Sequence, residues 1–142
     1  MEDRFTRLTL PASIQSLGAF LEFARAGAVT AGLSPADCDR LDLVLEELLV
    51  NVARYSYAPG EGEVELAYTA APGKLAIQVS DQGRFFNPLD RNEPDLGGTL
   101  SERPVGGLGL FLVRELVRFP TYFRENGWNR LSFIFPGGAA GN

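Results

Sequence analysis

The segment LDLVLEELLVNVARYSY, residues 41–57, constrains the fold more than any other part of the chain. At about 100° per residue, its apolar side chains occupy nearly the whole circumference of a helix. Leu41 and Leu45 begin a continuous packing stripe, while Leu43 and Val50 lie on the far side. A helix that is apolar nearly all round is typical of one covered on two sides.

Two polar residues interrupt this helix one turn apart. Glu47 and Asn51 fall in a strip between the packing stripe and the Leu43 and Val50 side. One interpretation is a solvated Glu–Asn pair on the helix flank, in which Glu47 could also pair with Arg54, because helix carboxylates are usually exposed. The other is a cleft in which Asn51 offers an amide oxygen to Mg²⁺ and Glu47 acts as a base. The helix alone leaves both open.

Periodicity and turn signals predict the remaining helices and strands. The predicted elements are a strand at 4–11, a helix from 13 to about 31, a helix from 34 to about 57, strands at 63–70 and 74–81, a helix at 106–119, and two strands within 121–135 joined by an Asn-Gly turn. This order predicts the α/β (α+β) class, with a mostly antiparallel, mixed sheet and three helices on one face.

Composition narrows the choice of function. With 142 residues, of which 45% are hydrophobic, residues 1–142 suit a single domain, and residues 137–142 are expected to be a frayed tail. A net charge of -5 without runs of like charge gives no electrostatic footprint for nucleic acid. The lone Cys38 fits a reducing cytoplasm, and the first residues suggest neither a signal peptide nor a membrane span. The absence of histidine excludes histidine-based catalysis, histidine metal sites and autophosphorylation on histidine.

A carboxylate and a glycine follow one of the predicted strands. In VSDQGRFFNP, Asp81 and Gly83 stand where the strand ends. A carboxylate in this position can accept a hydrogen bond from the exocyclic amine of adenine, and Gly83 would let the backbone approach a flat ring. The alternative is that Asp-x-Gly simply makes a turn.

The last helix begins with glycines. In PVGGLGLFLVREL, Gly106, Gly107 and Gly109 lead into the helix, whose free N–H groups can bind phosphate. The motif is neither a Walker A loop nor a Rossmann fingerprint, because Leu112 stands at the third glycine of the latter. A simple flexible helix cap is the alternative. Residues 82–105 before it contain three prolines and no periodicity, which indicates either a functional loop or a wrong assignment of elements.

Taken in this order, the three motifs resemble the nucleotide-site boxes of the GHKL, or Bergerat-fold, ATPase superfamily. Within it the chain is similar to the short bacterial anti-sigma-factor serine kinases, on LDLVLEELLVNVARYSY, VSDQGRFFNPLD and ERPVGGLGLFLVREL. The final NRLSFIF is similar to the closing strand of that family, so the resemblance covers residues 5–136, the expected core of the domain.

The resemblance implies a two-layer α/β sandwich with an ATP or ADP site. It implies that Asn51 coordinates Mg²⁺ and that Glu47 is the general base toward a substrate serine. Asp81 would bind the adenine amine with Gly83 beneath the ring, and Ser132 would share a water with Asp81.

The resemblance also assigns the triphosphate and the partners. Gly106, Gly107 and Gly109 would line the triphosphate, and residues 89–105 would form a nucleotide lid. The implied partners are a STAS-domain anti-anti-sigma factor and a sigma factor, with the chain itself a homodimer.

The chain departs from the family pattern at two positions. Tyr55 stands where many members have histidine, and Phe85 stands where many have a second glycine. These departures motivate a second hypothesis, a nucleotide-sensing module that binds partners without catalysis. A histidine kinase catalytic domain would need a phosphoacceptor histidine supplied in trans, and an acidic structural domain would make all three motifs accidental.

Overall fold

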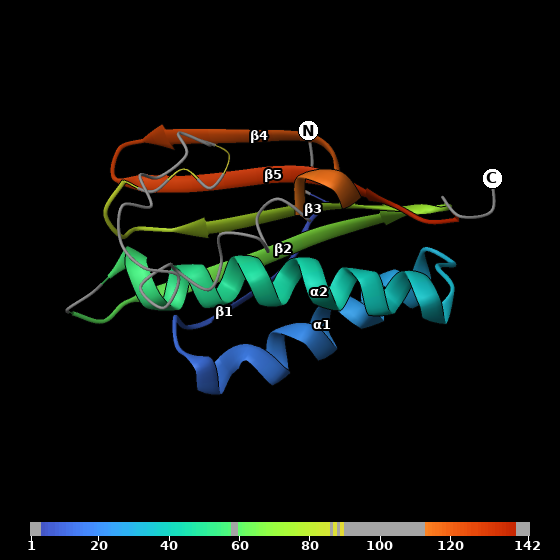
Figure 1. Ribbon diagram of the computed structural model, residues 1–142, viewed down its shortest axis with the longest axis horizontal. Coiled ribbons are helices and arrows are strands. Elements are labelled where there is room, and N and C mark those ends of the chain that lie inside the picture. The colour runs from blue at the N-terminus through green and yellow to red at the C-terminus, as the bar shows by residue number, and fades with distance from the viewer. Residues whose placement is uncertain (1–3, 58–59, 86, 88, 90–112, 139–142) are drawn as a thin grey trace, which may run out of the picture.

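The computed structural model is a five-stranded sheet with helices α1 and α2 on one face (Figure 1). It describes residues 4–57, 60–85, 87, 89 and 113–138. The named elements are β1 Thr6–Pro11, η1 Ile14–Ser16, α1 Leu17–Thr30, α2 Pro35–Asn51, η2 Val52–Ser56, β2 Glu63–Ala71, β3 Lys74–Asp81, β4 Arg118–Glu125 and β5 Trp128–Pro136.

The described strands form one sheet in the order β1-β2-β3-β5-β4, and every pairing is antiparallel. Two short turns make the hairpins that the sequence predicts. Gly73 has φ 81° in the turn between β2 and β3, and Asn126 and Gly127 have φ 53° and 84° between β4 and β5. Two consecutive positive φ values match the right-handed twist of the strands, which is why Asn-Gly suits this turn. The predicted fold class is confirmed.

The core lies between the sheet and the helices. Leu66, Ile77 and Phe133 on three neighbouring strands pack in one buried cluster with Leu45 of α2. Residues 113–116 are helical, and the flanking valines at 113 and 117 are buried in the same cluster, which places a third helical segment on this face. Among the described helices, none is long and apolar enough to cross a membrane.

Helix α2 begins at a capping box. The Ser34 hydroxyl accepts from the Asp37 N–H at 3.0 Å, and the Asp37 carboxylate accepts from the Ser34 N–H at 3.1 Å. Pro35 fills the first helical position, where no N–H is needed. The α-helix ends at Asn51, and η2 continues as a π-helical turn, a geometry that often occurs at functional sites. The predicted helix to about residue 57 therefore has a wider last turn.

The third helix ends three residues earlier than predicted, at residue 116, and β4 begins at Arg118. Phe119 has φ 53°, which no helix interior adopts, and Pro120 has no N–H to give to a ladder. The β4–β5 register shifts between Arg118 and Thr121. An edge strand such as β4 tolerates a proline at this irregularity.

The first residues of the expected frayed tail are held in place. The Gly137 N–H donates to the Gly73 carbonyl at 2.8 Å, and the Gly138 N–H donates to Asp37 Oδ2 at 3.0 Å. The expectation is wrong for these two residues, because the strand before them delivers their N–H groups to acceptors. Residues 139–142 lie outside the described part of the chain.

Acid is expected to unfold the protein partly through Asp37. Burial raises the pKa of this carboxyl, but hydrogen bonds from Gly138, Ser34 and Arg40 outweigh it and hold the pKa at about 2, below its ordinary 3.8. A carboxyl with a lowered folded-state pKa contributes stability above pH 3.8, which is lost as the pH falls toward 2. The loss should be on the order of 1–2 kcal/mol after allowance for solvent screening.

Urea unfolding between pH 5 and pH 2 measures this loss. Asp37→Asn should lower stability at pH 5 and flatten its dependence on pH. Asp39→Asn, where the side chain is 79% exposed, is the matched control and should keep the wild-type slope. Equal slopes in wild type and Asp37→Asn would contradict the role of Asp37.

Candidate functional site

Glu47 and Asn51 form a joined pair on α2. Asn51 is only 3% exposed, and its Nδ2 donates to the Glu47 carbonyl at 2.6 Å and to Glu47 Oε2 at 2.9 Å. In the part of the chain that the structure describes, Glu47 makes no ion pair with Arg54. Of the solvated alternative, the structure therefore excludes only the pairing of Glu47 with Arg54. Both hydrogen bonds use Nδ2, and no residue in the described ranges donates to the amide oxygen of Asn51.

Asp81 lies at the end of β3 and is 5% exposed. Its Oδ1 accepts from the Gly83 N–H at 2.8 Å and from Asn129 Nδ2 at 3.0 Å. No described residue donates a hydrogen bond to Oδ2. The carboxylate is thus held through one oxygen and offers the other as an acceptor.

A small pocket opens beside Asp81. Its walls combine apolar side chains of α2, η2 and the sheet with the polar groups around the carboxylate. The lining residues are Leu48, Val52, Val79, Asp81, Tyr122, Asn129 and Leu131. An apolar pocket with one aimed acceptor suits a flat ring that carries an amine on its edge. Leu48 of α2 and Val52 of η2 wall the pocket, whereas Glu47 and Asn51 are not among its lining residues. Each of the two polar residues directly precedes a lining residue and points about 100° away from it round the helix.

Gly83 is required by contact with the end of η2. A Cβ at this position would lie 2.2 Å from the Ser56 carbonyl oxygen, and the Arg84 N–H donates to that oxygen at 2.7 Å. The Ser56 hydroxyl is the one fully buried side-chain polar atom without a partner among the described residues. The sequence predicts a glycine beneath a ring; the structure shows a glycine that lets the loop after Asp81 close against the helix of Asn51.

Tyr57 is a further connection that the sequence analysis missed. Its hydroxyl donates to the Glu63 carbonyl at 2.6 Å and accepts from the Gln82 N–H at 2.7 Å. Burial raises the pKa of Tyr57, and the nearby Asp81 carboxylate raises it further. The phenol therefore stays neutral and keeps its donor. It ties the end of η2 to the residue that follows Asp81.

Ser132 does not lie beside Asp81. In the β3–β5 register, Ser132 stands opposite Gln78, whereas Asp81 stands opposite Asn129. Side chains alternate between the two faces of a sheet, so Ser132 points away from the face on which Asp81 lies. The expectation that Ser132 and Asp81 share a water is therefore wrong, because Asn129 occupies the place beside the carboxylate. Finding it from sequence needs the pairing of β3 with β5 as well as the position of the turn.

The two departures from the family pattern lie outside the pocket lining. Phe85 is 60% exposed, and its ring meets Tyr122 edge-on at 5.7 Å between centroids. Tyr55 is half-buried in η2. Phe85 thus stands at the rim rather than in the space for a ring. Gly106, Gly107 and Gly109 lie outside the described residues, as does the expected lid from residue 90 onward.

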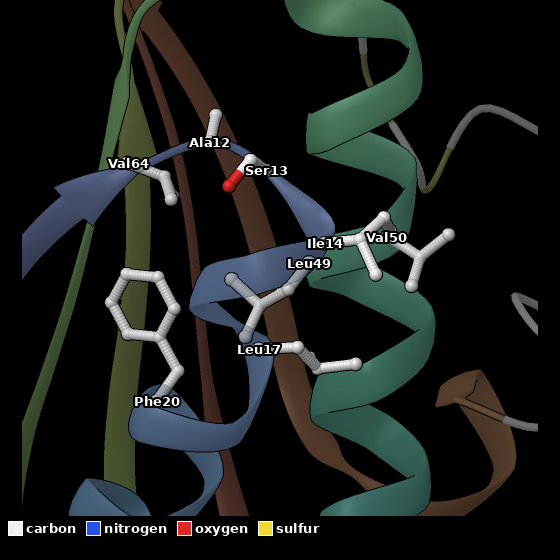
Figure 2. A pocket seen from close by; sticks show the side chains of 8 residues that line it. All are labelled: Ala12, Ser13, Ile14, Leu17, Phe20, Leu49, Val50 and Val64. Carbon is white, nitrogen blue, oxygen red and sulfur yellow. The ribbon is translucent and has the colours of Figure 1, made fainter.

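A second pocket lies on another flank of α2 (Figure 2). Ile14, Leu17 and Phe20 from the start of the first helical segment face Leu49 and Val50 of α2 there. Its lining contains no titratable side chain. It therefore lacks the charged acceptor that distinguishes the pocket at Asp81.

Comparison with known proteins identifies the family. Residues 10–135 match the model of the histidine kinase-like ATPase domain. The chain is 30% identical over 135 residues to the serine-protein kinase RsbW of Listeria monocytogenes, covering 89% of this chain and 83% of that protein. It is 28% identical over 93 residues to the serine/threonine-protein kinase BtrW of Bordetella bronchiseptica, covering 65% and 66%.

A solved structure supports the fold alone. The histidine kinase domain of the Erythrobacter litoralis EL346 blue-light activated histidine kinase superposes with a TM-score of 0.52 at 22% identity. The match covers 84% of this chain and 60% of that chain. The sheet, the helices and the sequence matches agree: the chain belongs to the histidine kinase-like ATPase domain family and is related to bacterial serine-protein kinases.

Proposed function

We propose that the chain binds the adenine of a nucleotide at Asp81 and the accompanying Mg²⁺ at Asn51. It then transfers a phosphoryl group from ATP to a serine of a partner protein. The observation that carries the proposal is the geometry of Asp81, whose Oδ1 is held by two N–H donors at the wall of an apolar pocket. Helix α2, which contributes Leu48 to the pocket wall, also carries Glu47 and Asn51. The names of the kinase relatives support the reaction class.

The donor set fits magnesium rather than a metal that needs a protein cage. Among the described residues there is no group of three or more acidic, histidine or cysteine side chains. Mg²⁺ is commonly held by one or two protein oxygens, with phosphates and waters completing its shell. The amide oxygen of Asn51 is the protein oxygen we assign to it. When bound, the ion would neutralise charge on the phosphates.

Glu47 is the group we assign to the serine proton. Asn51 holds its Oε2 at 2.9 Å, and no described residue hydrogen-bonds Oε1. Oε1 is thus the atom left to accept the proton of an incoming hydroxyl. In phosphoryl transfer the protein contributes mainly by placing the groups, and a fixed carboxylate next to the metal-binding amide does this. Gly106, Gly107 and Gly109 remain our assignment for the triphosphate.

The partners follow from the resemblance to anti-sigma-factor kinases. We assign the phosphoacceptor serine to a STAS-domain anti-anti-sigma factor and a second binding function to a sigma factor, in a bacterial cytoplasm. We also expect a homodimer. Light scattering tests the last point, since a mass of 15.4 kDa would refute it.

The second candidate is a nucleotide-sensing module that binds partners without catalysis. Phe85 at the pocket rim and Tyr55 in η2 favour it, because both differ from the family pattern. Incubation with labelled ATP and the STAS-domain partner separates the two candidates. Phosphoserine formed over many turnovers supports the kinase, and nucleotide binding without transfer supports the sensor.

Asp81→Asn should weaken Mg-ADP binding about 100-fold, because the amide replaces an acceptor that faces the ligand amine. Isothermal calorimetry measures the affinity. Asp39→Asn, on the surface of α2, is the matched control and should bind like wild type. Wild-type affinity in Asp81→Asn would place the nucleotide elsewhere on the molecule.

A further inference from the structure

An exposed apolar surface lies beside Glu47 on α2. Leu43 and Val50 stand roughly 40° and 60° round the helix from Glu47, both in the same direction. Leu48, which lines the pocket at Asp81, stands about 100° away in the opposite direction. Glu47 therefore separates the wall of that pocket from the apolar surface.

Ile14 extends this surface from η1 toward α2. It lines the second pocket together with Val50, and Figure 2 shows the two side chains next to each other. Ile14 is 53% exposed and Leu43 is 55% exposed, while Val50 is half-buried. We call Ile14, Leu43 and Val50 the apolar patch. Apolar side chains that are exposed together, unlike single ones, mark surfaces that bind another molecule.

The patch borders the approach to the unbonded oxygen of Glu47. No described residue hydrogen-bonds Glu47 Oε1. Leu43 and Val50 stand about 6 Å and 4.5 Å from Glu47 along the helix axis, one on each side of it. In the proposed function the adenine fills the pocket on the other flank of Glu47. A serine that reaches Oε1 therefore arrives on a segment that covers Leu43 and Val50.

A second copy of this chain fits the patch less well. In a two-fold contact the same surface meets itself, so a contact centred here would set two Glu47 carboxylates against each other. In the part of the chain that the structure describes, no cation pairs with Glu47 to offset this repulsion. Each chain also carries a net charge of -5. A segment of a different protein avoids this juxtaposition.

We propose that the apolar patch is the docking surface for the phosphoacceptor segment of the partner protein, and that this segment carries aliphatic side chains on both sides of its serine. The inference rests on the proposed function, since it concerns the substrate of the same site. An extended chain rises about 3.3 Å per residue. The side chains that reach Leu43 and Val50 therefore stand within about three residues of the serine on either side.

Leu43→Ser removes apolar surface from the patch at an exposed position, so the protein should still fold. It should raise the KM for the STAS-domain partner about tenfold, because one aliphatic contact is lost on docking. The kcat at saturating partner and the affinity for Mg-ADP should stay close to wild type, since the patch binds the segment without taking part in the chemistry. Ile14→Ser should behave alike, and Leu43→Met, which keeps the apolar surface, should keep the wild-type KM.

Val29→Ser is the matched control. Val29 is 65% exposed and lies at the far end of α1 from Ile14, so the same kind of change there should leave the KM unaltered. Mass spectrometry of the phosphorylated partner locates its serine, and we expect aliphatic residues within about three positions on both sides.

Two results overturn the inference alone: a wild-type KM in both Leu43→Ser and Ile14→Ser, or a phosphorylated serine without aliphatic neighbours. If Leu43→Ser instead lowered the mass measured by light scattering, the patch would join two copies of the chain and the inference would be wrong. Loss of Mg-ADP affinity in Leu43→Ser would likewise place the residue in the nucleotide site and contradict a docking role. Wild-type protein that transfers no phosphate refutes the proposed function itself, and the inference with it.

Discussion

Glu47→Gln is expected to slow phosphoryl transfer to the partner serine by about 10²–10⁴-fold while nucleotide affinity stays close to wild type. Glutamine has the same shape and can still accept from Asn51 Nδ2, so the 2.9 Å contact within the pair can persist. It cannot take the proton of the serine hydroxyl. Single-turnover transfer of labelled phosphate from ATP measures the rate, and calorimetry with Mg-ADP measures the affinity.

Glu46→Gln is the matched control, because it makes the same chemical change at an exposed position next in the chain. It should transfer phosphate at the wild-type rate. A Glu47→Gln protein that also transfers at the wild-type rate would remove Glu47 from the mechanism. Loss of ADP affinity in Glu47→Gln would instead give the residue a binding role.

Gly83→Ala is expected to lower the free energy of unfolding by about 3 kcal/mol and to abolish measurable Mg-ADP binding. The new Cβ would lie 2.2 Å from the Ser56 carbonyl oxygen and 2.5 Å from its carbon, so backbone must move. That movement separates the loop from η2 and displaces the Gly83 N–H from Asp81 Oδ1. Urea unfolding and calorimetry measure the two losses.

Gly18→Ala makes the same substitution where the structure leaves room. Nothing lies within 4 Å of its Cβ, and the residue is in the first turn of α1. Alanine should stabilise this helix by roughly 0.5–1 kcal/mol. If Gly83→Ala were as stable as wild type, the close contact with Ser56 would not exist in solution.

Much of the fold could be predicted from sequence because its signals are local. A capping serine followed by proline starts α2, and an Asn-Gly pair with two positive φ values closes the last hairpin. The end of the third helix could not be predicted this way. An apolar run that continues to Phe119 has helical spacing, but the backbone turns to φ 53° there, since β4 must pair with β5.

The site divides along the same line. Glu47 and Asn51 are four apart on one helix, so their spacing alone predicts that they meet. The position of Asp81 at a strand end was likewise readable. Asn129 lies 48 residues further on, and only the register of β3 with β5 brings it to Asp81. Without that register the sequence could not show which residue of β5 faces Asp81. Ser132 was assigned wrongly for this reason, since a shift of one residue along a strand moves a side chain to the other face of the sheet.

The contact of Gly83 with Ser56 depends on the π-helical turn of η2. A wider last turn leaves no periodic signal in a five-residue segment. Gly83 beneath a ring stays a prediction, and the sequence gives no sign of its contact with Ser56. The same limit applies to Tyr57, whose hydroxyl links two backbone groups from separate segments.

Equilibrium unfolding with and without Mg-ADP tests the central claim, an adenine nucleotide site at Asp81, most directly. A ligand that binds only the folded chain stabilises it by about 2.7 kcal/mol at 100 times its dissociation constant. The wild-type protein should gain this stability, and Asp81→Asn should gain little at the same concentration. No stabilisation of the wild-type chain at millimolar Mg-ADP, or equal stabilisation of both proteins, would contradict the account.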